Sequence, residues 1–137
     1  MAEFIEWQSH LNLGIAPIDY QHRELADLLN LLADALNADT ATAEPAALLQ
    51  RIHRHARAHF RYEEQLMLSS GFRDHINHQR EHTMLLGELK SLTTTVSRGQ
   101  GTVDSDLMHA LRDWLIAHIV TSDREFSSHY LRVTSDK

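Results

Sequence analysis

Histidine is the residue type that stands out in this sequence, because 11 of its 137 residues are histidines and none is a cysteine. Imidazole and carboxylate groups without thiolates suit non-haem iron or manganese, although nitrogen ligands alone also accept zinc or copper. Five histidines and two acidic residues recur on faces where a helix would otherwise bury apolar side chains. These candidate metal ligands are His22, His59, Glu63, His78, His82, His118 and Asp123.

The spacing of the candidate ligands favours a shared site. His59 and Glu63 are four residues apart, as are His78 and His82. Residues at this spacing lie on one helix face, one turn from each other, so each pair can hold one side of a metal site. A single inward histidine is more often a hydrogen-bonded core residue than a ligand. Seven such residues on faces almost free of Arg and Lys need a common partner, because burying each one unpaired is costly.

Seven ligands are too many for one ion and suit two. We assume that both ions are six-coordinate and that both carboxylates bridge them. Five imidazoles then fill five positions, the carboxylates fill four and one solvent-derived oxygen bridge fills two, so eleven of twelve positions are taken. The remaining position could take a small exogenous ligand.

The rhythm of apolar residues predicts the helices that must hold these side chains. An N-terminal arm of about residues 1–17 comes first. The predicted helices are 18–37, about 45–70, 74–97 and about 103–132, the last beginning near Val103-Asp104, and the stretch 38–44 is a predicted loop. Pro45 suits the first turn of the second helix, and Gly71 suits its C-terminal cap.

Four helices joined by short loops predict an all-α fold, an antiparallel up-down-up-down four-helix bundle with an N-terminal arm, in one domain over residues 1–137. The candidate ligands lie near the start of the first and third helices and toward the end of the second and fourth. Antiparallel packing therefore puts all of them at the same end of the bundle.

The fourth helix needs an irregularity. His118 and Asp123 are five residues apart, a rotation of about 140° on a regular helix, which would turn the carboxylate away from the histidine's face. The apolar stripe also slips after His118, because Phe126 and Tyr130 continue it one residue late. We predict a single-turn π-bulge between His118 and Asp123.

Composition excludes several classes of protein. The 13 Lys and Arg against 19 Asp and Glu give a net charge of −6, without the basic stripe that nucleic acid binding requires. No stretch is apolar enough to cross a bilayer, and the first residues do not resemble a signal peptide. We therefore expect a cytoplasmic monomer with neither nucleic acid nor membrane as a partner.

Motifs along nearly the whole chain carry a resemblance to a known family. They are Trp7, Gly14-Ile15, Ile18-Asp19-Tyr20-Gln21-His22, His59-Phe60-Arg61-Tyr62-Glu63-Glu64, Met67, His78-Gln79-Arg80-Glu81-His82, Trp114-Leu115-Ile116-Ala117-His118-Ile119 and Asp123. In this order and spacing they resemble the hemerythrin family, specifically its single-domain bacteriohemerythrin members. The chain departs from the family pattern at Phe72-Arg73, where Tyr-Pro is frequent, and at Phe126, where tyrosine is frequent. We expect neither departure to touch a ligand.

The resemblance implies two iron ions per chain, bridged by an oxo or hydroxo group and by the carboxylates of Glu63 and Asp123. It further implies that one iron is held by His78, His82 and His118, and the other by His22 and His59. Dioxygen would bind reversibly at the open position of the two-histidine iron. An apolar pocket would exclude water there and so slow irreversible oxidation. By position, its residues would be Leu25, Phe60, Trp114, Leu115 and Ile119.

The six other histidines are expected at the surface or at bundle ends. They are His10, His53, His55, His75, His109 and His129. His55 and His75 each lie one turn from a candidate ligand, so either could support the site from behind.

Oxygen transport or storage, without enzymatic turnover, is the function we expect, with an unknown protein as a possible recipient of the oxygen. The carboxylate-rich diiron oxidases use Glu-x-x-His pairs, and this sequence has none. Peroxide or nitric oxide chemistry, and oxygen or redox sensing through a partner protein, stay open as alternatives.

Overall fold

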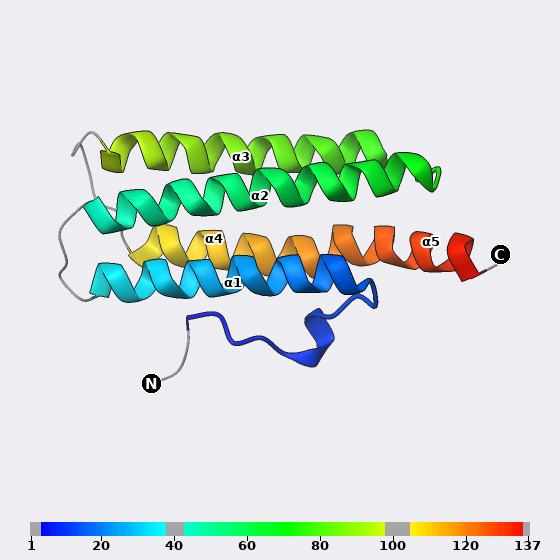
Figure 1. Cartoon of the computed structure of the whole chain (residues 1–137), viewed down its shortest axis with the longest axis horizontal. Coiled ribbons are helices and arrows are strands. Elements are labelled where there is room, and N and C mark those ends of the chain that lie inside the picture. The colour runs from blue at the N-terminus through cyan, green and yellow to red at the C-terminus, as the bar shows by residue number, and fades with distance from the viewer. Residues whose placement is uncertain (1–3, 38–42, 98–104, 136–137) are drawn as a thin grey trace.

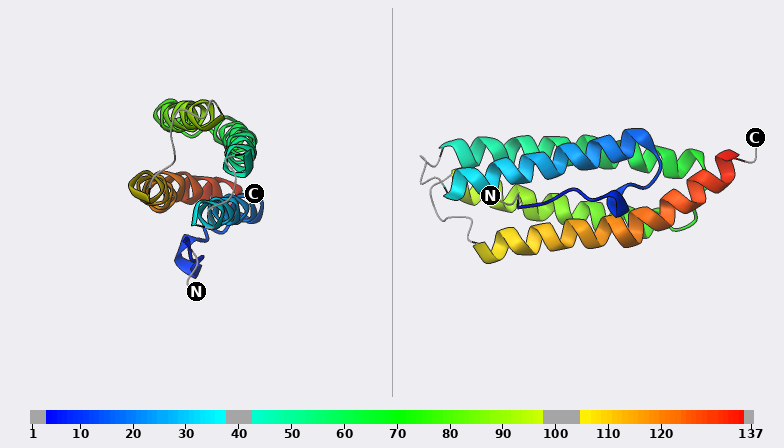
Figure 2. Two further views of the ribbon diagram at one scale, coloured as in Figure 1. Left: turned by 90° about the vertical axis from the view of Figure 1, so that its left-hand side faces the viewer. Right: turned by 90° about the horizontal axis from the view of Figure 1, so that it is seen from below.

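Four long helical stretches form the molecule in the computed structural model, which describes residues 4–37, 43–97 and 105–135. Their elements are α1 (Ala16–Asn37), α2 (Ala43–Ser69), α3 (His75–Ser97), α4 (Ser105–His118), a π-helical segment η2 (Ile119–Asp123) and α5 (Arg124–Ser135). The described residues contain no strand. Successive helices run in opposite directions (Figure 1), and the end-on view in Figure 2 places them around one core. The predicted all-α antiparallel bundle is confirmed.

The helix boundaries differ little from those predicted. α1 begins at Ala16, two residues early, because Pro17 is accommodated in a first helical turn. α2 begins at Ala43, so the last two residues of the predicted loop 38–44 are helical. The predicted start of the fourth helix near Val103-Asp104 lies outside the described residues.

The N-terminal arm runs between α1 and the α4–α5 helix in the right-hand view of Figure 2. The Oγ of Ser127 donates a hydrogen bond to the carbonyl of Leu13 (2.7 Å). The carboxylate of Asp19 accepts the backbone N–H of Leu13 (2.7 Å) and of Gly14 (3.1 Å), which has a φ of 90°. These bonds anchor the arm to α5 and to the first turn of α1, one turn before His22.

The π-helical segment Ile119–Asp123 confirms the predicted irregularity in the fourth helix. Its wider turn returns Asp123 to the face of His118, with Oδ1 of the aspartate 3.1 Å from Nε2 of the histidine. One extra residue in this helix therefore places a carboxylate in the bundle core.

A glycine cap ends α2 beside the cluster of candidate ligands. Gly71 has a φ of 70°, in the left-handed region. The N–H of Phe72 donates to the carbonyl of Met67 (2.9 Å) and the N–H of Gly71 to that of Leu68 (3.3 Å), which is the Schellman pattern. The turn that follows leads directly into α3 and its first candidate ligand, His78.

We expect Gly71→Ala to lower the free energy of unfolding by about 1 kcal/mol, because a Cβ is strained in the left-handed region even though the space around it is open. Gly87→Ala is the matched control, since Gly87 is helical and exposed. That substitution should stabilise the chain by about 0.5–1 kcal/mol. Urea unfolding measures both changes in the free energy of unfolding. Changes of the same sign in the two variants would contradict the role of the cap.

Candidate metal centre

All seven candidate ligands are buried at one level of the bundle, toward the end where α2 turns into α3. α1 supplies His22, α2 supplies His59 and Glu63, α3 supplies His78 and His82, and the fourth helix supplies His118 and Asp123. Each helix stretch thus contributes at least one imidazole or carboxylate.

The cluster divides into two groups that share their carboxylates. One group is Glu63, His78, His82, His118 and Asp123, and the other is His22, His59, Glu63 and Asp123. Within each group the ligand atoms all lie within 4.8 Å of one another. Donors on opposite sides of one ion are about 4.2 Å apart when each bond is about 2.1 Å, so each group has the dimensions of a single-ion site.

Glu63 directs its two oxygen atoms to different groups. Oε1 lies 2.7 Å from Nε2 of His78 and 3.4 Å from Nε2 of His82. Oε2 lies 3.3 Å from Nε2 of His59. The carboxylate therefore spans the two groups.

Asp123 spans the groups in the same way. Its Oδ1 lies 2.8 Å from Nε2 of His78 and 3.1 Å from Nε2 of His118. Its Oδ2 lies 3.2 Å from Nε2 of His22. Two carboxylates with this arrangement could each bridge a pair of ions.

The donor atoms lack the hydrogen bonds that burial demands. Nε2 of all five histidines, both oxygens of Glu63 and Oδ1 of Asp123 have no hydrogen-bond partner, although several lie close together. In the described part of the chain, no Arg or Lys pairs with either carboxylate. Atoms that converge without bonding one another fit a cation between them, because a metal would satisfy them all. The seven residues fit a two-metal site, while ligation itself stays a prediction.

Polar groups behind the imidazoles orient their rings. Nδ1 of His59 donates to Oε1 of Gln21 (2.5 Å), and Nδ1 of His82 donates to Oε2 of Glu64 (3.0 Å). A hydrogen on Nδ1 leaves the lone pair of Nε2 free for a metal. These partners therefore set the tautomer that ligation requires.

Glu81 of α3 lies behind the ring of His118 in a comparable way. Its Oε1 lies 3.7 Å from Nδ1 of His118 and accepts the hydroxyl of Ser122 (3.1 Å). The sequence interpretation assigned no role to Gln21, Glu64 or Glu81. Each directly adjoins a candidate ligand in the sequence and lies in one of the motifs that carry the family resemblance, and these two features were the available signals.

Of the five predicted pocket residues, the two aromatic ones, Phe60 and Trp114, stack on histidines of the three-histidine group. Leu25, Phe60, Leu115 and Ile119 are buried and Trp114 is half-buried. Phe60 stacks on His82, with ring centroids 3.9 Å apart and planes 5° apart. Trp114 stacks on His118 at 4.9 Å and 8°. That the five residues form an oxygen pocket stays a prediction.

Phe72 and Phe126 contradict the expectation that the family departures stay away from the ligands. Both rings are buried and lie edge-on to the ring of His78, with centroid distances of 6.4 Å and 6.5 Å. The π-helical segment rotates α5 so that Phe126 also faces the core. An apolar wall thus closes the end of the cluster.

The remaining histidines lie outside the cluster, as expected. Nε2 of His55 bonds the carbonyl of Gln21 (2.9 Å), the residue whose side chain holds His59. Nδ1 of His75 bonds the carbonyl of Phe72 (3.0 Å) at the start of α3. One ring nitrogen of each residue thus bonds the backbone, and Nδ1 of His55 lies 3.4 Å from Oε2 of Glu24. Among the described residues, neither histidine bonds a candidate ligand.

The electrostatics of the metal-free cluster keep the carboxylates charged. Burial and the charge of Asp123 favour protonation of Glu63, but the surrounding histidines outweigh them and lower its pKa to about 2. Burial likewise opposes a charge on His78, but the carboxylates of Asp123 and Glu63 raise its pKa to about 10. Without a metal, the proton on His78 balances part of the negative charge of the two carboxylates.

Comparisons with known proteins agree with this geometry. The family model described as the hemerythrin HHE cation binding domain matches residues 13–129. A bacteriohemerythrin of Methylococcus capsulatus is 32% identical, covering 82% of this chain and 84% of its own, and one of Pseudomonas paraeruginosa is 30% identical, covering 85% and 75%. A crystal structure of wild-type hemerythrin superposes with a TM-score of 0.86 at 26% identity, covering 93% of this chain and 98% of its own.

Metal uptake should release protons. At pH 7 the metal-free chain holds a proton on His78, whose pKa is about 10, and ligation requires a neutral imidazole. Each fall of one pH unit below 10 should therefore weaken metal affinity about tenfold through this proton alone. Calorimetric titration of anaerobic ferrous ion in buffers of different ionisation enthalpy measures the proton count. At least one proton should be released per chain, and the control variant His53→Ala should release the same number. No proton release between pH 6 and 8 would contradict the assignment of His78 as a protonated ligand candidate.

Proposed function

The chain belongs to the hemerythrin family, and we propose that it binds dioxygen reversibly at a non-haem diiron centre, for oxygen transport or storage. The observation that carries the proposal is the arrangement of the two carboxylates. Each directs one oxygen to one histidine group and its other oxygen to the other group. Shared carboxylates would place two ions side by side, which would let the pair supply two electrons to dioxygen.

The two groups offer unequal numbers of protein donors, which supports an open position on one ion. The group with His78 holds three imidazoles and the group with His22 holds two, besides the shared carboxylates. An oxygen bridge would complete six-coordination on the three-histidine side and leave one position free on the other. Dioxygen would therefore bind on the side of His22 and His59.

The protein's own contribution is to position the ligands and to exclude water. Iron would supply the electrons for dioxygen binding, and the residues named above would hold it. Leu25, Leu115 and Ile119 are all buried, have apolar side chains and lie within one helical turn of His22 or His118 in the sequence. An apolar surrounding keeps protons and anions from the open position, which favours reversible binding over oxidation.

Oxygen titration after anaerobic reduction, followed by visible absorption, tests the proposal. The iron-loaded protein should cycle between deoxygenated and oxygenated forms several times as oxygen pressure falls and rises, with little peroxide released. Continuous turnover of oxygen, peroxide or nitric oxide in the presence of a reductant would instead show an enzyme.

Leu115→Ala should leave the iron content nearly intact but speed conversion of the oxygenated form to the diferric form by at least severalfold. Truncation of a buried leucine opens a cavity without removing a ligand, and water that enters can supply protons. Stopped-flow absorption measures the rate.

Two variants serve as controls for this prediction. Leu89→Ala removes an equally buried leucine two turns beyond His82 on α3, so it should cost similar stability, about 2–5 kcal/mol, without changing the rate. His59→Ala should lose iron. Equal acceleration in Leu115→Ala and Leu89→Ala would show that general loosening, and not the pocket, governs oxidation.

A further inference from the structure

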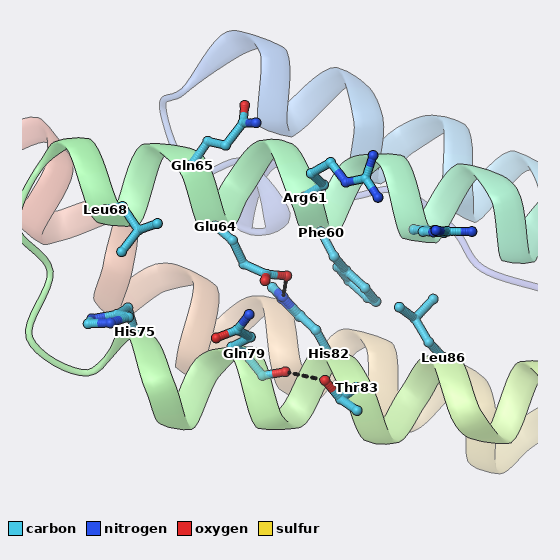
Figure 3. Close-up of a pocket in the computed structure, with 11 residues that line it drawn as sticks. Phe60, Arg61, Glu64, Gln65, Leu68, His75, Gln79, His82, Thr83 and Leu86 are labelled. Atoms are coloured by element: carbon cyan, nitrogen blue, oxygen red, sulfur yellow. Dashed lines mark hydrogen bonds and ion pairs between the residues drawn. The ribbon is translucent and has the colours of Figure 1, made fainter.

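A groove between α2 and α3 reaches the cluster of candidate ligands from the surface. Its volume is about 460 Å³, and Figure 3 shows Phe60 and Glu64 of α2 pointing toward His82 and Leu86 of α3. His82 is one of the seven candidate ligands, so this groove and the candidate centre share a side chain.

The floor of the groove is in direct contact with that ligand. The ring of Phe60 stacks on the ring of His82 with centroids 3.9 Å apart, and Glu64, which lines the groove, accepts the Nδ1 hydrogen of His82 at 3.0 Å. On its other side, Nε2 of His82 lies 3.4 Å from Glu63 in the cluster. One imidazole therefore separates the groove from the position of the metal.

The rim of the groove is positively charged although the chain as a whole has a net charge of −6. Arg57 and Arg61 are exposed, lie one helical turn apart and form no ion pair with any described residue. Glu64, the acidic residue that lines the groove, already accepts a hydrogen bond from His82. The two guanidinium groups are therefore free to bind an acidic partner.

An exposed leucine adds an apolar contact beside these charges. Leu68 lines the groove and is 65% exposed. Arginine next to an exposed apolar side chain is typical of protein interfaces, in which charge steers the encounter and apolar area holds the complex. This combination favours a protein partner over a free small molecule.

We propose that the groove between α2 and α3 docks the acidic surface of a one-electron donor protein, which reduces the oxidised iron centre through His82. This inference rests on the proposed function, in which occasional oxidation leaves the irons ferric. Each docking event oxidises one donor by one electron and reduces one ferric ion to ferrous, so two donors restore one centre.

Charge reversal at the rim tests the proposal. The probe is a reduced plant-type [2Fe–2S] ferredoxin, an acidic one-electron carrier, mixed with the diferric protein in a stopped-flow instrument. The variant Arg57→Glu/Arg61→Glu should be reduced at least about tenfold more slowly than the unmutated protein at low salt. Reduction by the small cation hexaammineruthenium(II) should not slow.

The control Arg51→Glu/Arg54→Glu changes the net charge by the same amount on the same helix, but away from this groove. It should retain the ferredoxin rate within about twofold. An equal loss in both variants would show a general effect of net charge and would overturn the proposal.

Binding of oxidised ferredoxin gives a readout that needs no electron transfer. Amide chemical shifts should change around Arg61 and Leu68, and the dissociation constant should rise at least about tenfold in Arg57→Glu/Arg61→Glu. Shift changes confined to another face would overturn the docking site even if the protein binds oxygen reversibly. Failure of oxygen binding with docking intact would instead refute the proposed function alone.

Discussion

The division of two carboxylates between two sets of imidazoles is the constraint on which this structure depends. Glu63 and Asp123 are buried, and no Arg or Lys among the described residues pairs with them. Each directs one oxygen to one histidine group and its other oxygen to the other group. Such a cluster is tolerable in a bundle core only if cations or protons satisfy it. All four helical stretches must therefore reach it at one level, and the π-helical turn at Ile119–Asp123 is needed to bring the second carboxylate inward.

The groups behind the imidazoles make the two sides of the site electrostatically different. Carboxylates stand behind His82 and His118, whereas a neutral amide stands behind His59. Negative charge behind a ligand increases its basicity and favours a more highly charged ion. The imidazoles of the three-histidine side are thus the more basic ligands, whereas no charged group stands behind His59 on the other side. The exposed groove reaches the cluster at His82, on the three-histidine side.

Most of the fold and the positions of the candidate ligands could be predicted because helical periodicity places each side chain on a face. The π-bulge was predictable for the same reason, since His118 and Asp123 cannot share a face on a regular helix. The contacts of Gln21, Glu64 and Glu81 could not be predicted, because they depend on how adjacent helices rotate against each other. Phe126 was predicted on the inward stripe, but the approach of its ring to His78 depends on how α5 and α3 pack against each other.

Anomalous diffraction at the iron absorption edge from crystals of the iron-loaded protein tests the central claim most directly. The account predicts two iron peaks per chain, one bonded to His78, His82 and His118 and the other to His22 and His59, with Glu63 and Asp123 each contributing an oxygen to both. A single peak, or two peaks that share neither carboxylate, would contradict it.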